Sequence, residues 1–244
     1  MSAGVMLVTG GSRGIGEAVA LLGAQRGYDI VLTYANNAAR ADAVVKRIEA
    51  AGGRALAVQA DAAHEADIAR MFAAVDGMGR LAALVYNAAI TGPHSPLAEA
   101  TTATIDAVLD VNLRGAILCC QSAIRRMSTR FAGQGGAIVL LSSRASQYGS
   151  PAEFVWYAAS KGGVESLNLG LARELGPEGI RVNVVSPGPI DTEMHRPGKL
   201  EDRARRAPLQ RAGTPAEVAE SVLFLCSDAA SYISGTNLAV AGGM

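Results

Sequence analysis

Short apolar runs alternate with helical patterns along the whole of this 244-residue chain. The runs are apolar throughout, which is typical of parallel strands buried on both faces. They occupy residues 5–9, 29–34, 54–61, 81–89, 136–143, 180–188 and 237–241. Strands that alternate with helices favour an α/β fold, a doubly wound, Rossmann-type parallel sheet of about seven strands with helices on both faces.

Helical patterns fill the intervals between these runs. They cover residues 17–27, 39–53, 65–79, 101–130, 155–175 and 214–228. The pattern at 101–130 is expected to break or bend near Asn112, and Thr214 and Pro215 should open the last helix as N-cap and first helical residue. The polar segment 189–212 interrupts the periodicity, which predicts a mobile loop with short helices that covers a substrate. Without a repeat or linker, residues 1–244 are expected to form one domain.

Composition excludes several classes of function. The 22 basic and 22 acidic residues leave no net charge, whereas a nucleic-acid-binding protein should carry a basic excess. The short cluster Arg203, Arg205 and Arg206 is interpreted as a solvated helix face. The N-terminus lacks a signal-peptide pattern, and no apolar run approaches the ~18 residues of a membrane span. The chain is therefore expected to be soluble, cytoplasmic and free of membrane contact.

The cysteines and histidines do not have the spacing of a metal site. Cys119 and Cys120 are adjacent within an apolar run, and we interpret them, with Cys226, as small core residues. The three histidines are scattered, and each is predicted to be a surface residue or to stand behind the site. They are His64, His94 and His195.

The glycine loop Gly10-Gly11-Ser12-Arg13-Gly14-Ile15-Gly16 lies between the first strand and the first helix. In that position, glycines let the backbone approach a pyrophosphate seated on the helix N-terminus. NAD sites often place an acidic residue about 20 residues on, but here Tyr34 is followed by Ala35, Asn36 and Asn37. No carboxylate would repel a 2′-phosphate, and Arg13 could pair with one. NADP(H) is thus favoured over NAD(H).

Tyr157 and Lys161 lie four residues apart, on one face of the predicted helix at 155–175. An opposite charge within roughly 4–6 Å can lower the pKa of a phenol and make it usable as an acid or base. A hydroxyl from Ser142 or Ser143, at the end of the preceding strand, could hold a substrate carbonyl against that phenol. The pair alone is a weak motif, because an aromatic residue and a charge can share a helix face by chance.

Several motifs in the correct order strengthen this interpretation, and with them the chain resembles the short-chain dehydrogenases/reductases over essentially its whole length. They are Thr9 to Gly16 (TGxxxGIG), Asp61, Tyr86-Asn87-Ala88-Ala89 (NNAG), Asn112, Ser143, Tyr157 to Lys161 (YxxxK) and Pro187 to Thr192 (PGxxxT). Tyr86 and Ala89 depart from the NNAG turn, which is expected to persist with altered backbone strain.

The resemblance implies an oxidoreductase that transfers hydride between NADP(H) and a carbonyl or alcohol. Tyr157 would exchange the proton, Lys161 lower the phenol pKa and bind the nicotinamide ribose, Ser143 orient the carbonyl, and Asn112 hold a water that connects Lys161 to solvent. Asp61 would contact the adenine and Thr192 the nicotinamide carboxamide. The residues expected to bind cofactor are Gly10, Ser12, Arg13, Gly14, Ile15, Gly16, Asn36, Asp61, Ala62, Asn87, Ala88, Tyr157, Lys161, Pro187, Gly188, Ile190 and Thr192.

The substrate remains open at the level of sequence. A 3-oxoacyl-thioester reductase and a sugar or polyol dehydrogenase both fit the family, and a non-catalytic dinucleotide sensor is the alternative from another class. Residues 90–97, 144–156 and 189–212 would wall the pocket but contain no motif that identifies the substrate. The family also implies a homotetramer that pairs through the helices at 101–130 and 155–175.

Overall fold

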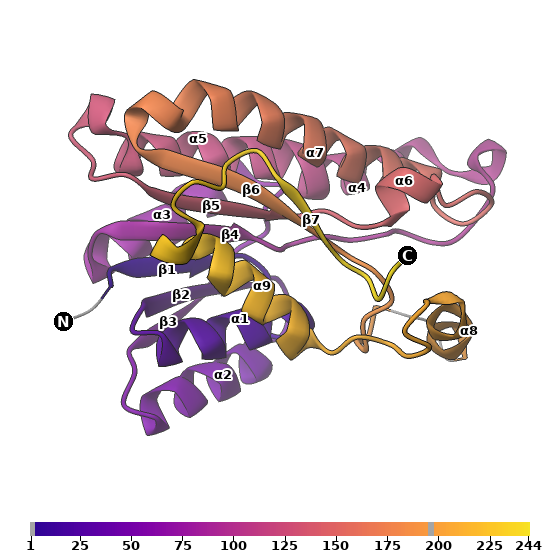
Figure 1. Cartoon of the computed structure of the whole chain (residues 1–244), viewed down its shortest axis with the longest axis horizontal. Helices are drawn as coiled ribbons and strands as arrows, with labels where there is room; N and C mark the ends of the chain where they lie inside the picture. The colour runs from indigo at the N-terminus through magenta and orange to yellow at the C-terminus, as the bar shows by residue number, and fades with distance from the viewer. Residues whose placement is uncertain (1–2, 195–197) are drawn as a thin grey trace.

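A seven-stranded parallel sheet forms the centre of the protein (Figure 1). The computed structural model describes residues 3–194 and 198–244. The strands follow the order β3-β2-β1-β4-β5-β6-β7, and every neighbouring pair is parallel. They are β1 (Val5–Val8), β2 (Asp29–Tyr34), β3 (Ala55–Gln59), β4 (Leu81–Tyr86), β5 (Gly136–Leu141), β6 (Ile180–Pro187) and β7 (Asn237–Val240). The predicted fold class is confirmed.

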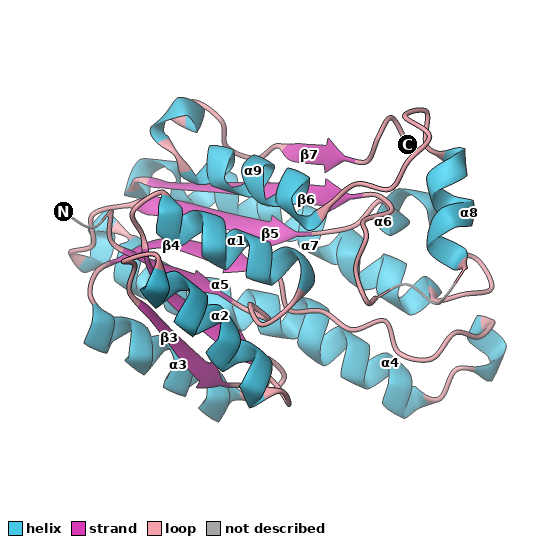
Figure 2. Cartoon of the chain, turned by 90° about the horizontal axis from the view of Figure 1, so that it is seen from below, coloured by secondary structure: helices cyan, strands magenta, loops and turns pink. Residues whose placement is uncertain are grey.

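Helices cover both faces of this sheet (Figures 1 and 2). The α-helices are α1 (Gly14–Gln25), α2 (Ala38–Ala50), α3 (Glu65–Met78), α4 (Thr102–Leu109), α5 (Gly115–Met127), α6 (Ala145–Tyr148), α7 (Val155–Leu175), α8 (Lys199–Arg206) and α9 (Pro215–Cys226). Single turns of 3-10 helix are η1 (Leu97–Glu99), η3 (Thr129–Phe131), η4 (Gly176–Glu178) and η5 (Asp228–Ala230), and η2 (Asp110–Arg114) is a π-helical turn.

The strands are apolar throughout because successive side chains enter two different cores. Val5 and Leu7 of β1 pack into the core beneath α3, α5 and α7, whereas Met6 and Val8 pack into the core beneath α1, α2 and α9. The three cysteines are buried free thiols, as predicted. Cys119 and Cys120 lie in the first core and Cys226 in the second. Burial raises the pKa of Cys120 to about 12.

The predicted break near Asn112 is confirmed as the π-helical turn η2, which joins α4 to α5. The Tyr86 hydroxyl, at the end of β4, donates a hydrogen bond to the Val111 carbonyl oxygen within this turn. A Cβ at Gly115 would stand 2.5 Å from that hydroxyl oxygen, so a glycine is needed where α5 begins. Tyr86, which stands where the family motif has an asparagine, is buried, and its hydrogen bond connects the sheet to the turn that carries Asn112.

The NNAG-like turn persists despite its substitutions, as expected. Residues 86–89 are not among the described residues with a positive φ angle. Hydrogen bonds from the Asn87 and Ala88 N–H groups to Thr9 Oγ1, at 2.9 and 3.0 Å, hold the turn.

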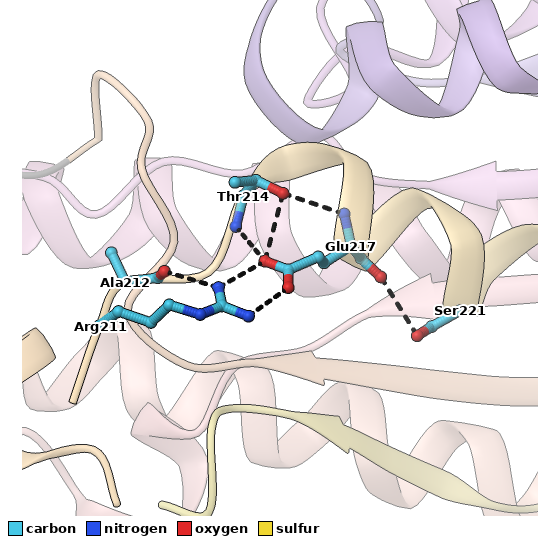
Figure 3. Close-up of polar contacts among 5 residues, drawn as sticks. All are labelled: Arg211, Ala212, Thr214, Glu217 and Ser221. Carbon is cyan, nitrogen blue, oxygen red and sulfur yellow. Dashed lines mark hydrogen bonds and ion pairs between the residues drawn. The ribbon is translucent and has the colours of Figure 1, made fainter. Parts of the chain in front are cut away.

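After segment 189–212 the chain enters helix α9, whose N-terminus is capped (Figure 3). Thr214 and Glu217 form a capping box at the start of α9, and Pro215 is its first residue, as predicted. The Arg211 guanidinium and the Thr214 N–H lower the pKa of the Glu217 carboxyl to about 2. Within the segment, α8 is the only helix among the described residues. His195 lies outside the described residues.

None of the described helices is long and apolar enough to cross a membrane.

Candidate active site

Two glycines of the loop after β1, Gly11 and Gly16, have no room for a side chain. A Cβ at Gly16 would lie 2.2 Å from the Gly10 carbonyl oxygen and 2.6 Å from Asn87 Nδ2. Gly10 and Gly14 have φ angles of +64° and +55°, a region that L side chains rarely adopt. The loop leads into α1, whose N-cap residue Arg13 makes no side-chain capping bond. This backbone therefore leaves the helix N-terminus open to an anion.

Two threonines hold the loop in place: Thr9, the first residue of the TGxxxGIG motif, and Thr33, which the sequence interpretation missed. Thr33 of β2 accepts the Gly10 N–H at 3.1 Å, and Thr9 Oγ1 accepts the N–H groups that follow β4. Asn87 Nδ2 in turn donates to the Thr9 and Gly10 carbonyl oxygens, each at 3.0 Å. A threonine inside an otherwise apolar buried strand, as at Thr33, is the signal that could have revealed this role.

The residues predicted for the adenosine end lie after β2 and β3, whose ends pair at Tyr34 and Gln59. Asn36 is exposed. The Asp61 side chain accepts the Ala63 N–H at 2.9 Å, and its backbone N–H donates to Asp67 Oδ2 at 2.8 Å. These bonds fix the turn that leads into α3. Ala62 within it is buried.

Two arginines share one carboxylate at this end of the site. Glu193 Oε2 lies 3.1 Å from Arg13 Nη1 and 2.7 Å from Arg40 Nη1. The sequence interpretation included Arg13 and missed Arg40, the third residue of α2. The signal that could have revealed Arg40 is a cation in the first turn of a helix, where it is unfavourable.

The PGxxxT segment follows β6 and lies against the same loop. A Cβ at Gly14 would be 3.3 Å from the Thr192 methyl group, so the two segments are in contact. A Cβ at Gly188 would lie 2.8 Å from Ala241 Cα, which explains that glycine through the close approach of the chain after β7. Pro187 and Ile190 are buried, and Ser12 and Ile15 are half-buried.

Tyr157 and Lys161 both lie on α7 and are buried, with 6% and 2% of their surface exposed. The ammonium is 5.7 Å from the centroid of the Tyr157 ring, and it donates a hydrogen bond to the Leu141 carbonyl oxygen at 2.7 Å. The helix therefore brings phenol and ammonium together at the end of β5, as the spacing predicts.

The two serines after β5 point to different partners. The Ser142 hydroxyl is 2.8 Å from Glu165 Oε1 and 3.2 Å from the Lys161 carbonyl oxygen. The Ser143 Oγ accepts the Ala145 N–H at 3.1 Å, and its hydroxyl acts on the Tyr157 phenol, whose pKa it lowers. Glu165 Oε1 also lies 2.6 Å from the Ser146 hydroxyl. This carboxylate, which the sequence interpretation missed, thus holds both sides of the turn that presents Ser143.

Burial has the largest effect on Tyr157. It raises the pKa of the phenol, while the hydrogen bond with Ser143 and the charge of Arg203 act in the opposite direction. Lys161, one helical turn away, is not among the groups that shift the pKa of the phenol, although the sequence interpretation expected it to lower this pKa. In the protein without cofactor, Tyr157 is therefore a protonated phenol at neutral pH.

Arg203 corrects the prediction of a solvated helix face on α8. Its guanidinium pairs with Glu153 at 2.6 Å and lies 5.9 Å from the centroid of the Phe154 ring, which itself packs edge-on against Tyr157. Arg205 is exposed and pairs with Asp202 on its own helix, so for that residue the prediction holds. Segment 189–212 therefore contacts Phe154, one of the aromatic residues beside the phenol.

Asn112 is fully buried in η2. Its Oδ1 accepts the Ile90 N–H, and its Nδ2 donates to the Ile90 carbonyl oxygen, both at 2.9 Å. Nδ2 also donates to Ser160 Oγ at 3.0 Å. These bonds leave one lone pair of Oδ1 for a further partner. Trp156, next to Tyr157 on α7, is buried and donates to the Thr91 carbonyl oxygen at 2.8 Å.

The buried ammonium leads to a prediction about stability. Burial lowers the pKa of Lys161 from 10.5 to about 8, so the unfolded chain binds more protons between these values. Lys161 should therefore add a rise to the free energy of unfolding as pH increases from about 8 toward 10, whereas the buried thiols, whose pKa burial raises, act in the opposite direction. Lys161→Met should remove a contribution to this rise on the order of 2 kcal/mol, as measured by urea unfolding at the two pH values.

A matched control for this experiment is Lys46→Met. Lys46 is an exposed lysine on α2, and its replacement should leave the pH dependence of unfolding unchanged. If wild type and Lys161→Met gave the same slope with pH, the ammonium would not be desolvated in the folded protein.

Comparison with known proteins identifies the family. The sequence model of the enoyl-(acyl carrier protein) reductase family matches residues 10–244, from the glycine loop to the end of the chain. The chain is a short-chain dehydrogenase/reductase. It is 46% identical to the uncharacterized oxidoreductase YgfF of Escherichia coli, in an alignment that covers 98% of this chain and 99% of that protein.

Other members of the family are similar over their whole length. A 3-oxoacyl-[acyl-carrier-protein] reductase of Synechocystis is 39% identical, with 100% of this chain and 98% of that reductase aligned. Among solved structures, a short-chain dehydrogenase from Burkholderia cenocepacia in complex with NADP superposes with a TM-score of 0.93 at 39% identity, covering 99% of this chain and 98% of that one. This short-chain dehydrogenase/reductase is therefore an oxidoreductase.

Proposed function

We propose that this short-chain dehydrogenase/reductase transfers a hydride between NADP(H) and a carbonyl or secondary alcohol, with Tyr157 as the acid or base. The observation that carries the proposal is the meeting of three groups at one place: the buried Tyr157 phenol, the Lys161 ammonium 5.7 Å from the centroid of its ring, and the Ser143 hydroxyl, which acts to lower the pKa of the phenol. All three groups lie at the carboxyl ends of the strands, the edge at which the glycine loop also lies. In open α/β sheets, ligands bind at that edge.

The residues present fit a dinucleotide. The glycine loop is a cradle that a Cβ would fill, and the N-terminus of α1 has no side-chain cap. Gly10, Gly14 and Gly16 with Asn87 would line the pyrophosphate, and Thr192 with Ile190 the nicotinamide end. When bound, the nicotinamide supplies or accepts the hydride.

Side chains of the protein bind the substrate oxygen and transfer the proton to it. Ser143 holds the substrate oxygen, and Tyr157 donates its proton to that oxygen during carbonyl reduction. Because burial raises its pKa, the phenol keeps this proton through neutral pH, which favours the direction of reduction. Lys161 would bind the ribose hydroxyls, and Asn112 fixes the loop at Ile90 beside the site.

The charges at the adenosine end support NADP(H) over NAD(H). Arg13 and Arg40 are two cations near the end of β2, where no acidic residue follows Tyr34. A guanidinium recognises a phosphate by paired hydrogen bonds. The NADP complex of the similar Burkholderia protein is consistent with this preference.

We infer the broader setting from the family. The chain would act as one dinucleotide-binding and catalytic domain, with residues 189–212 as the cover over a small-molecule substrate, in a cytoplasmic homotetramer. Exposed apolar side chains on and beside α5 and α7 support pairing through these helices. They are Ile117, Phe131 and Leu169. A 3-oxoacyl thioester is the first substrate class to test, because the Synechocystis relative bears that activity in its name, and a sugar or polyol is the second.

The test is a steady-state screen of 3-oxoacyl thioesters, simple ketones and sugars with NADPH and NADH. We expect turnover with NADPH, and a reduction rate that stays level through neutral pH and falls only at alkaline pH as Tyr157 loses its proton. Tight NADPH binding without turnover of any compound would instead indicate a dinucleotide sensor.

A further inference from the structure

Glu193 occupies a place that the surrounding charges make attractive to an anion. Its carboxylate contacts Arg40 at 2.7 Å and Arg13 at 3.1 Å, through the same oxygen. The three residues come from separate parts of the chain, namely the start of α1, the start of α2 and the segment after β6. One negative charge therefore faces two positive ones.

Both arginines lie where a cation is disfavoured. Arg13 is the N-cap of α1, and Arg40 lies in the first turn of α2. Each helix N-terminus already carries a partial positive charge, equivalent to roughly half an elementary charge. Glu17 also acts on Arg40, but it is paired with Arg47. Two guanidinium groups beside two helix N-termini therefore keep an excess of positive potential. The arginines accordingly lower the pKa of Glu193, Arg40 more strongly than Arg13.

The contact is also easily exchanged. About half of each side chain is exposed, with 58% for Arg13, 46% for Arg40 and 56% for Glu193. Ion pairs between exposed side chains contribute little to stability, because water and salt screen them. A phosphate dianion offers more charge and more acceptor oxygens than a carboxylate, so it would compete well for the same two guanidinium groups.

We propose that Glu193 occupies the place of the 2′-phosphate of NADP(H) and is displaced from Arg13 and Arg40 when that cofactor binds. This inference rests on the cofactor preference proposed above. Glu193 is then a specificity-determining residue, since it lowers the affinity for the phosphorylated cofactor and leaves the affinity for NAD(H) unchanged. It directly follows Thr192, which contacts Gly14 of the glycine loop. Cofactor binding would therefore act on the first residues of the substrate-covering segment.

The decisive experiment compares NADPH and NADH binding by fluorescence titration of the full chain. Glu193→Gln keeps the size of the side chain and removes its charge. It is expected to lower the Kd for NADPH by about three- to tenfold, because competition for the arginines is weakened, and to change the Kd for NADH by less than about twofold. The gain for NADPH should shrink at high salt, since the attraction is exposed to solvent.

Two further variants separate this effect from a general change in surface charge. Glu220→Gln removes a carboxylate of similar exposure that pairs with Arg26, at the C-terminal end of α1, and should leave both Kd values unchanged. In an Arg40→Ala background, Glu193→Gln should give a smaller gain for NADPH than it gives in the wild type, because one of the contested cations is missing.

The outcomes distinguish this inference from the function on which it rests. If wild type bound NADPH tightly and Glu193→Gln bound it no better, or gained equally for NADH, Glu193 would not compete with the 2′-phosphate and only this inference would fail. If wild type bound neither dinucleotide, the proposed function would fail together with it.

Discussion

Replacing Tyr157 with phenylalanine is expected to lower kcat/KM by about 10²–10⁴-fold, the range that a positioned general acid or base contributes. Phenylalanine retains the ring that packs edge-on against Phe154, at a centroid distance of 5.3 Å. It removes only the hydroxyl on which Ser143 acts. The Kd for NADPH should therefore change little, and steady-state kinetics beside fluorescence titration will separate the two effects.

A matched control is Tyr232→Phe, which removes a hydroxyl from a fully exposed tyrosine far along the chain from α7. It should retain wild-type kinetics. A Tyr157→Phe enzyme that reduced substrate at nearly the wild-type rate would show that another group transfers the proton. Equal loss of NADPH binding and turnover would show instead that the hydroxyl has a structural role.

The second large effect is expected from Gly16→Ala. A methyl group at this position would lie 2.2 Å from the Gly10 carbonyl oxygen and 2.6 Å from Asn87 Nδ2. Because the first of these is a backbone atom, the glycine loop must move to admit the methyl group. We expect the Kd for NADPH to rise by about 100-fold or more, and the free energy of unfolding to fall by roughly 1–3 kcal/mol, as in other overpacked sites.

Gly170→Ala makes the same chemical change where there is room for it. This glycine lies inside α7, and a Cβ there would meet no atom within 4 Å. Alanine should stabilise the helix by roughly 0.5–1 kcal/mol and leave the Kd for NADPH unchanged. If Gly16→Ala bound NADPH as tightly as Gly170→Ala, the close packing of the glycine loop would not matter for the cofactor.

Much of the site can be predicted because its groups are neighbours in sequence or follow buried strands. Tyr157 and Lys161 are one turn apart on α7, and the glycines of the loop lie between β1 and α1. The choice between Ser142 and Ser143 could not be made in this way, because adjacent residues point in opposite directions. Only the packing of α7 against β5 puts Glu165 beside Ser142 and the Tyr157 phenol beside Ser143.

The parallel sheet, the glycine loop and the helical pair Tyr157 and Lys161 can be predicted from the sequence, because they depend on local periodicity, backbone freedom and short spacing. Contacts between residues far apart in the chain become visible only in the folded structure. Arg40 and Glu193 are separated by 153 positions, and Arg203 and Glu153 by 50. Such pairs form only after the strands have set the order of the chain ends along one edge of the sheet. Charge and spacing in the sequence therefore do not predict which of these residues form pairs. The partial burial of Arg203 against Phe154 also depends on the tertiary structure.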